Sequence, residues 1–150
     1  MRQRAVVLAA VLCAAVCVWA ESRVPIVAVI PFEAAGVAQH DADAFADRLA
    51  EELAASGTVS VADRHAVGAL LARQGLTATE LIDAERAAAF ADYLAVGNLF
   101  AIGTAAGALV TLIGVNPVTA SVAARQAESM DALMAAVPGL CAELLESMVK

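Results

Sequence analysis

The sequence predicts an α/β fold with a mixed sheet of about five strands flanked by helices. The first observation is the apolar run 24–30, which suits a strand covered on both faces. The second is that amphipathic helical segments then alternate with short strand-like runs. The third is that residues 94–115 have the layout of a β-hairpin. The expected order is strand, helix, strand, two helices, three strands and helix, parallel at first and antiparallel in the final meander.

The first twenty residues predict a secretory signal peptide, which would leave residues 21–150 as a single periplasmic α/β domain. A basic start precedes a charge-free apolar stretch that is shorter than a bilayer span needs. Val18-Trp19-Ala20 fits a cleavage site, so we expect cleavage after Ala20. An uncleaved amino-terminal anchor is the alternative. A lipoprotein signal fits poorly, because neither Cys13 nor Cys17 follows a small residue.

The composition is acidic, with sixteen acidic and nine basic side chains. Two of the basic ones, Arg2 and Arg4, would leave with the signal peptide. An acidic domain repels nucleic-acid phosphates and anionic lipid headgroups, so we expect neither as a partner. Only Cys141 would survive cleavage, which excludes an internal disulfide. We expect it to be a small buried apolar residue, with an intermolecular disulfide or a reactive thiol as the alternative.

The region before the hairpin predicts alternating elements. Residues 33–39 are small and predict a loop. A helix from about His40 buries a face that includes Leu49 and ends at Gly57. A short strand at 58–61 follows, because polar and apolar residues alternate there.

Two further helical segments are expected before the hairpin. Asp63 can cap the first of them, and Gly75 can end it. The second runs from Thr77 or Asp83 to about Tyr93.

Residues 94–115 carry no charged side chain and form the main ambiguity. The stretch is long and apolar enough to be a single-pass membrane span. Its four glycines and the lack of basic or aromatic anchors at its ends favour a buried hairpin, with strands at 94–102 and 108–115. In that hairpin Ile102 should lie in the core.

The carboxyl-terminal part predicts a turn, a strand and a helix. Asn116-Pro117 is a turn signal, and 118–124 completes the meander. A last helix begins near Ser129, and Pro138 either kinks it or starts its second segment.

Acidic residues and one histidine gather at the start of the first expected helix: His40, Asp41, Asp43 and Asp47. The helix dipole favours carboxylates at this position without a metal, and calcium needs about six oxygen ligands. We therefore expect no metal site.

No catalytic or cofactor-binding constellation is visible either. Cys141 and His65 would form a nucleophilic pair only if the fold brought them together with an aspartate. Gly103 and Gly107 lack the lysine and the strand-to-helix context of a phosphate-binding loop. We expect a protein that is not an enzyme and needs no cofactor.

Four segments, in their order, resemble domains related to the curli secretion channel subunit (CsgG-like) and the amino-terminal domain of the translocation protein TolB. They are a first strand, a second strand ending in Asp-Arg, a helix end with Gln-Gly, and an entry into the third strand: residues 27–32, 59–64, 70–76 and 91–97. The chain departs from the family in lacking its lipidated cysteine, a glycine in the turn near 115–119, and segments long enough for a channel's membrane hairpins.

The resemblance implies a bacterial cell-envelope protein. Its function would be that of a non-enzymatic, protein-binding accessory in envelope assembly, secretion or the regulation of cell-wall enzymes. The partner would be another envelope protein or a second copy of the chain. Association with the outer membrane is compatible with this role. Arg64, in the Asp-Arg pair, would hold a nearby carboxylate or carbonyl, with direct partner contact as the alternative.

Overall fold

The computed structural model describes residues 23–75, 91–115 and 118–150. Its elements follow one another in this order: β1 (Ile26–Val29), β2 (Glu33–Ala35), α2 (Gln39–Ala55), β3 (Ser60–Val61), α3 (Arg64–Gln74), β4 (Tyr93–Ile102), β5 (Ala105–Val115), β6 (Val118–Ala127), α5 (Met130–Ala135) and α6 (Val137–Val149). The signal peptide, most of the third helical stretch and the turn at 116–117 lie outside the described residues.

The predicted mixed sheet flanked by helices is confirmed. Its strand order is β3-β1-β4-β5-β6, and β2 also pairs with β4, which makes six strands. β1 pairs in parallel with β3 and β4, whereas β4, β5 and β6 form an antiparallel meander.

The prediction of a loop over 33–39 is wrong at its start, where β2 forms. β1 pairs with only the first part of β4, at residues 93–95. β2 pairs with the next part, at residues 98–100. The long β4 would otherwise leave backbone donors and acceptors unpaired there, and such groups are nearly always paired in native structures.

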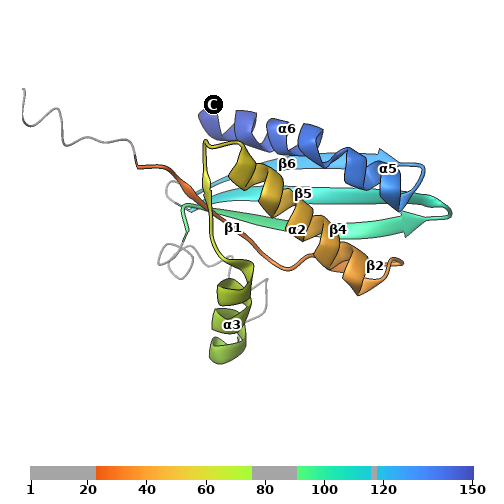
Figure 1. The fold of residues 1–150 in the computed structure, drawn as a ribbon, viewed down its shortest axis with the longest axis horizontal. Coiled ribbons are helices and arrows are strands. Elements are labelled where there is room, and N and C mark those ends of the chain that lie inside the picture. Colours follow the sequence, from red (N-terminus) through yellow and green to blue (C-terminus); the bar gives the residue numbers. More distant parts are fainter. Residues whose placement is uncertain (1–22, 76–90, 116–117) are drawn as a thin grey trace, which may run out of the picture.

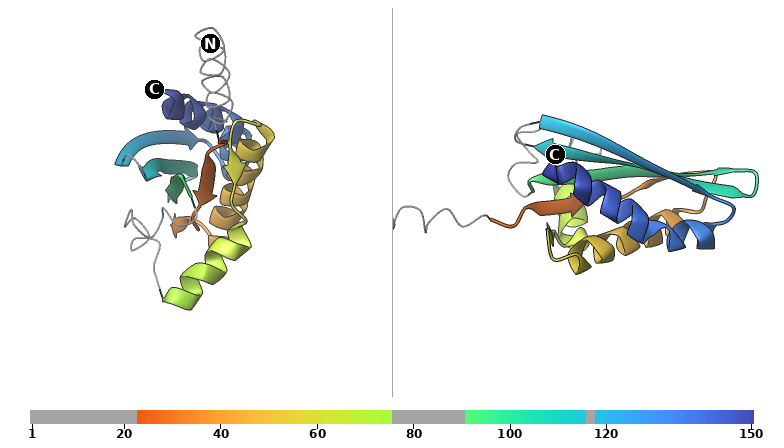
Figure 2. Two further views of the ribbon diagram at one scale, coloured as in Figure 1. Left: turned by 90° about the vertical axis from the view of Figure 1, so that its left-hand side faces the viewer. Right: turned by 90° about the horizontal axis from the view of Figure 1, so that it is seen from above.

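One face of the sheet is covered along its length by α2, α5 and α6 (Figures 1 and 2). Leu49 lies on the buried face of α2, as expected, with no exposed surface. Phe32 and Phe45 pack with their ring centroids 5.7 Å apart. From the sheet, alternate residues of each long strand enter this core, which includes Leu99, Val110 and Ala123.

Among the described residues, the helix that covers the other face is α3, which lies against β1 near the start of β4 (Figure 1). Val67 and Leu71 of α3 form a smaller core with Ile30, Leu94 and Val115. The two cores therefore differ in extent, and only the first follows β4, β5 and β6 along their length.

Local signals set the helix ends as the sequence predicts. The carboxylate of Asp63 accepts a hydrogen bond from the backbone N–H of His65 at 2.9 Å, and so caps α3. Gly75 ends α3 with φ = 62°, in the left-handed region that glycine enters without strain. Pro138 lies in the first turn of α6, so it starts a second helical segment rather than kinking one helix.

Residues 94–115 form the predicted hairpin, and the alternative of a membrane span through them is wrong. β4 and β5 pair from Tyr93↔Gly114 to Ile102↔Ala105. Among the described residues, none of the helices combines the length and apolar character that crossing a bilayer requires. The turn is tighter than expected, since β5 already begins at Ala105 and only Gly103 of the turn has a positive φ, 63°.

Candidate functional site

The most distinctive surface is the side of the meander that faces away from α2, α5 and α6. We call it the open face, and define it by the outward alternate residues of three strands: Asn98, Phe100 and Ile102 of β4; Leu109, Thr111 and Ile113 of β5; Val118, Ala120, Val122 and Ala124 of β6. Figure 2, right, shows α2, α5 and α6 on one side of these strands.

Large apolar side chains on the open face contact solvent. Val118 is 70% exposed, Ile102 65%, Val122 60% and Leu109 39%. The expectation that Ile102 lies in the core is therefore wrong. The physical reason is that the hairpin extends beyond the part of this face that α3 covers.

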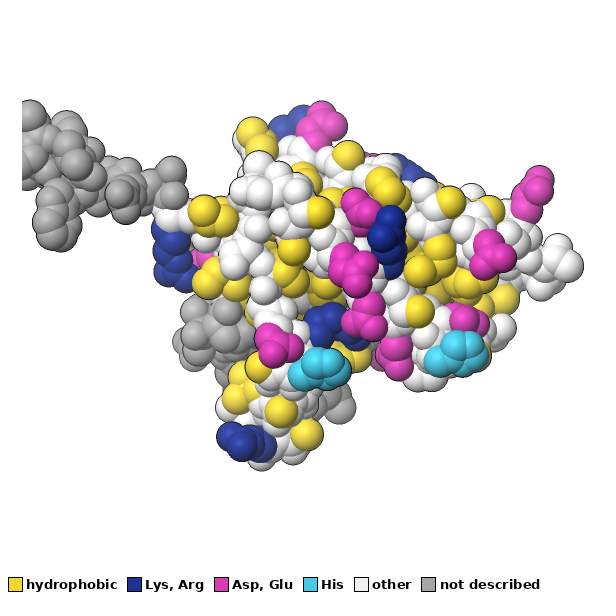
Figure 3. Space-filling view, viewed as in Figure 1, with side chains coloured by type: hydrophobic (Ala, Val, Ile, Leu, Met, Phe, Trp, Pro, Cys, Tyr) yellow, Lys and Arg dark blue, Asp and Glu magenta, His cyan; other side chains and the backbone are white. Residues whose placement is uncertain are grey.

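Charge is segregated between the two sides of the sheet. The strands carry no charged side chain from residue 93 to residue 124. Arg125 of β6 turns toward the helices, where its Nη2 lies 2.6 Å from Oε2 of Glu143. The acidic side chains of α2 and α6 lie on the helical side (Figure 3). The open face is thus uncharged in an acidic protein.

Phe100 of β4 lies on the open face, opposite a glycine of β5. It pairs across the hairpin with Gly107, and a Cβ placed on that glycine would collide with the phenyl ring. The ring therefore covers the space that a side chain would fill, an arrangement known to rescue glycine within strands. Apolar surface thus continues from β4 onto β5 at this glycine.

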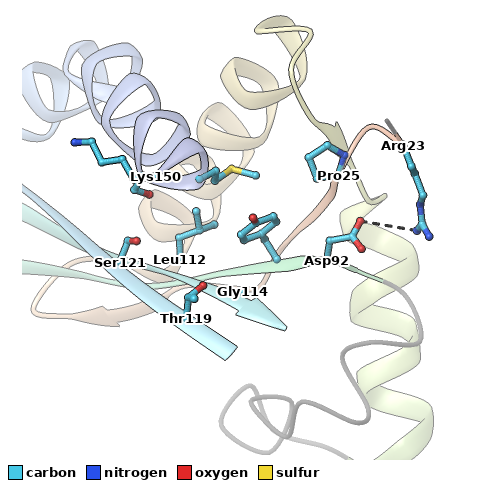
Figure 4. Close-up of a pocket in the computed structure, with 11 residues that line it drawn as sticks. Arg23, Pro25, Asp92, Leu112, Gly114, Thr119, Ser121 and Lys150 are labelled. Carbon is cyan, nitrogen blue, oxygen red and sulfur yellow. Dashed lines mark ion pairs between the residues drawn. The ribbon is translucent and has the colours of Figure 1, made fainter. Parts of the chain in front are cut away.

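A cavity of about 490 Å³ opens on the other side of the sheet, between β1, the start of β4 and the end of α6 (Figure 4). Its charged groups already have partners. Asp92 accepts a hydrogen bond from the backbone N–H of Ile26 at 2.8 Å and lies 3.8 Å from Arg23. Lys150 pairs with Glu146 at 3.2 Å. The hydroxyls of Ser121 and Thr119 also line the cavity, but no histidine or cysteine accompanies them.

The acidic cluster at the start of α2 forms no metal site. Among the residues that the structure describes, none of the groups of three or more potential ligands could hold an ion. Asp41 pairs with His40 at 3.1 Å, and Asp43 accepts a hydrogen bond from Gln39. These contacts are those of a solvated helix start.

Arg64 has the structural role that was expected of it. Its guanidinium pairs with the carboxylate of Asp47 and donates to the backbone carbonyl of Asp43 at 3.2 Å. These contacts tie the start of α3 to the outer side of α2. The arginine thus holds in place the helix that covers part of the second sheet face.

Cys141 is buried in the larger core, as expected, and is 4% exposed. Burial, with a smaller contribution from the charge of Glu52, raises the pKa of its thiol above the usual value of a cysteine. A thiol with a raised pKa holds little of the reactive thiolate at neutral pH. Its environment is thus that of a packed side chain, away from His65 on the exposed start of α3.

The sequence reasoning did not identify the open face. A signal for it was present, because an uncharged stretch that contains Asn98 and Thr111 at alternate positions suits a strand with only one fully covered face. The sequence could not show how much of the second sheet face α3 covers.

Comparisons with known proteins place the fold. No family model matches this chain, and no curated protein matches its sequence. Among solved structures, the lipoprotein GNA1162 from Neisseria meningitidis has a TM-score of 0.55 at 13% identity, over 69% of this chain and 81% of its own. The LpoB carboxyl-terminal domain from Salmonella enterica has a TM-score of 0.50 at 15% identity, over 69% and 84%.

The PelC dodecamer from Paraburkholderia phytofirmans has a TM-score of 0.50 at 18% identity, over 84% of this chain and 88% of its own. At such identities the likeness is one of fold. The chain therefore shares its fold with the lipoprotein GNA1162 and with the LpoB carboxyl-terminal domain. The curli channel subunit and TolB are not among these three structures, so the resemblance to their families stays a prediction.

Proposed function

We propose that this chain is a non-enzymatic accessory domain of the bacterial cell envelope that acts by binding another protein through its open face. The observation that carries the proposal is the uncharged, apolar surface on the three strands of the meander. Monomeric soluble proteins rarely expose a large contiguous apolar patch, and such patches mark interaction sites. An apolar surface that extends over three strands suits a protein partner better than a small molecule, which binds in concave pockets.

The periplasm is the compartment in which we place this interaction. The support is the signal-peptide pattern that ends at Ala20, together with the fold shared with envelope lipoproteins. Amino-terminal sequencing of the exported protein should begin at Glu21. An intact Met1 on the exported protein would contradict this part of the proposal.

Within the envelope, we propose an accessory role in assembly, secretion or the control of cell-wall enzymes. Its partner is another envelope protein or a second copy of the chain. Self-association has support from PelC, which shares the fold and forms a dodecamer in its crystals. The absence of charge on the open face suits both kinds of partner, because burying an unpaired charge would oppose association.

The test is site-specific photocrosslinking in cells. A photoreactive residue at position 122, on the open face, should give a discrete crosslinked product that mass spectrometry can identify. The matched control is position 51 on α2, where the Glu51 side chain is also largely exposed, at 72%. A product from position 51 alone, or equal products from both positions, would show that binding does not use the open face.

A lysine at position 102 sharpens this test. Ile102 is on the open face but on a different strand from Val122, and it is well exposed. Placing a charge there should not unfold the domain. It should weaken the crosslink from position 122 if the partner covers β4 as well as β6. An unchanged crosslink would limit the interface to β6.

A further inference from the structure

The partner can be specified further from β6, the last strand of the sheet. β6 is ten residues long and pairs only on one side, with β5. No strand among the described residues pairs with its outer side. An edge of this kind presents a row of backbone donors and acceptors that another strand can extend.

Proteins normally protect such edges, but β6 carries none of the usual devices. Its register with β5 runs without a bulge from Val115↔Val118 to Ala106↔Ala127. It contains no proline and no lysine, and its single charged side chain, Arg125, is bound to Glu143. Short length, bulges, prolines and charges are the features that prevent edges from pairing. The edge is therefore competent to add a strand.

The opposite edge of the sheet cannot receive β6. It is formed by β3, which has two residues, and beside the far half of β4 by β2, which has three, so it is short and broken. A head-to-tail chain of copies would need both edges, whereas an antiparallel pair of identical strands needs only one. We propose that two copies of this chain join β6 to β6 in antiparallel fashion across a twofold axis, forming one continuous sheet. The inference rests on the proposed function, names its partner as a second copy and confines the contact to β6, the edge strand of the open face.

The residues of β6 suit pairing with themselves. With the axis at Val122, small side chains meet on the open face, since Ala120 lies opposite Ala124 of the second copy. On the helical side, Arg125 lies opposite Thr119, so the two arginines do not face each other. Like charges directly opposite one another would destabilise a pair of strands, and this arrangement avoids them.

Charge balance also singles out this edge. Both acidic side chains of α6 on the side of β6 have a cation beside them: Glu143 pairs with Arg125 at 2.6 Å, and Glu146 with Lys150 at 3.2 Å. By contrast, α2 carries five acidic side chains and one arginine. Two acidic copies therefore repel one another least where their β6 edges meet, while the strongly acidic helix stays apart.

The first experiment measures the mass of the protein in solution. The chain is produced in full, so that any processing of its amino-terminal segment occurs, and is studied by sedimentation over a range of concentrations. We expect a dimer. Val122→Lys should raise the dissociation constant at least about tenfold, because it places like charges together at the axis. Ile102→Lys is the matched control and should leave it unchanged. Circular dichroism shows that both variants are folded.

The second experiment traps the pairing directly. In Val122→Cys the two new thiols would face each other, so oxidation should give a disulfide-linked dimer, while the buried Cys141 of the native chain should not. Ile102→Cys should remain monomeric on a denaturing gel.

Three results would overturn the inference. They are a monomer at every concentration, a dimer that Ile102→Lys rather than Val122→Lys dissociates, and a dimer that Val122→Cys does not crosslink. The proposed function fails separately. A monomer that still crosslinks from position 122 to a different envelope protein removes the β6 pairing and leaves the binding domain in place.

Discussion

The two faces of the sheet are built from the same strands and yet differ in what covers them. On the helical face, β5 contributes Val110, which has no exposed surface, beneath α2, α5 and α6. On the open face, the preceding residue of β5, Leu109, is 39% exposed. Apolar residues in a strand therefore indicate that its face will be covered. They do not indicate whether its own chain or a partner covers it.

The largest expected effect comes from placing the same charge on each face. Val110→Lys would bury an ammonium group in the larger core, so we expect it to lower the free energy of unfolding by about 4 kcal/mol or to prevent folding. Val122→Lys, at a position that is 60% exposed, should change it by less than about 0.5 kcal/mol when unfolding is measured at concentrations where the protein is monomeric. Urea unfolding followed by circular dichroism measures both. Equal losses would mean that the open face is packed in the isolated protein.

A smaller effect should separate two glycines by the space around them. A Cβ on Gly97 would meet the ring of Phe32 at 2.7 Å and the carbonyl of Leu109 at 2.8 Å. Gly97→Ala should therefore overpack the helical face and cost about 1–3 kcal/mol.

The matched control is Gly139→Ala in α6, where nothing lies within 4 Å of an added Cβ. Because alanine favours helix over glycine, this variant should gain up to about 1 kcal/mol. Thermal unfolding of both variants should give shifts in opposite directions. Shifts of the same sign would show that the covered face has room at Gly97.

Next in size is the contact that holds α3 over part of the second face. Arg64 and Asp47 pair across two helices, and the arginine side chain is only 17% exposed. A double-mutant cycle of Arg64→Ala and Asp47→Ala should give a coupling energy of about 1 kcal/mol. In the single variants, the backbone amide protons near Val67 and Leu71 should exchange with solvent faster than in the native protein. A coupling energy near zero would mean that apolar packing alone keeps α3 in place.

The smallest effect concerns pH. Because burial raises the pKa of Cys141, the folded state holds the thiol proton more tightly than the unfolded state does. As the pH rises through 9.0, the unfolded chain loses this proton first, so the free energy of unfolding should fall. Cys141→Ala should unfold with less dependence on pH in this range. If Cys141→Ala and the native protein show the same dependence of unfolding on pH, the thiol has the same pKa in the folded and unfolded states.

Several local features followed directly from the sequence, because neighbouring residues decide them. Asp63 and Gly75 mark the ends of α3 through a side-chain cap and a left-handed residue. Leu49 lies inward because its helical spacing places it with other apolar residues. The hairpin and the absence of charged anchors around it could likewise be predicted from residues 94–115.

Other features depended on contacts between distant segments. Glu33–Ala35 form a strand because the far half of β4 needs a parallel partner, and no local pattern indicates this. Arg64 meets Asp47 only after α3 folds beside α2.

By itself, the sequence determined the order of the described elements other than β2, the ends of α3, the mixed sheet and the inward face of α2. Apolar spacing and turn residues act over a few neighbouring positions, so their effects can be predicted from the sequence. Only the tertiary structure decided that Ile102 and Val122 contact solvent and that β6 is an unpaired edge. The physical reason is that an apolar residue looks the same in the sequence whether helices of its own chain or a partner protein cover it. Only the packing of the helices shows which residues stay exposed.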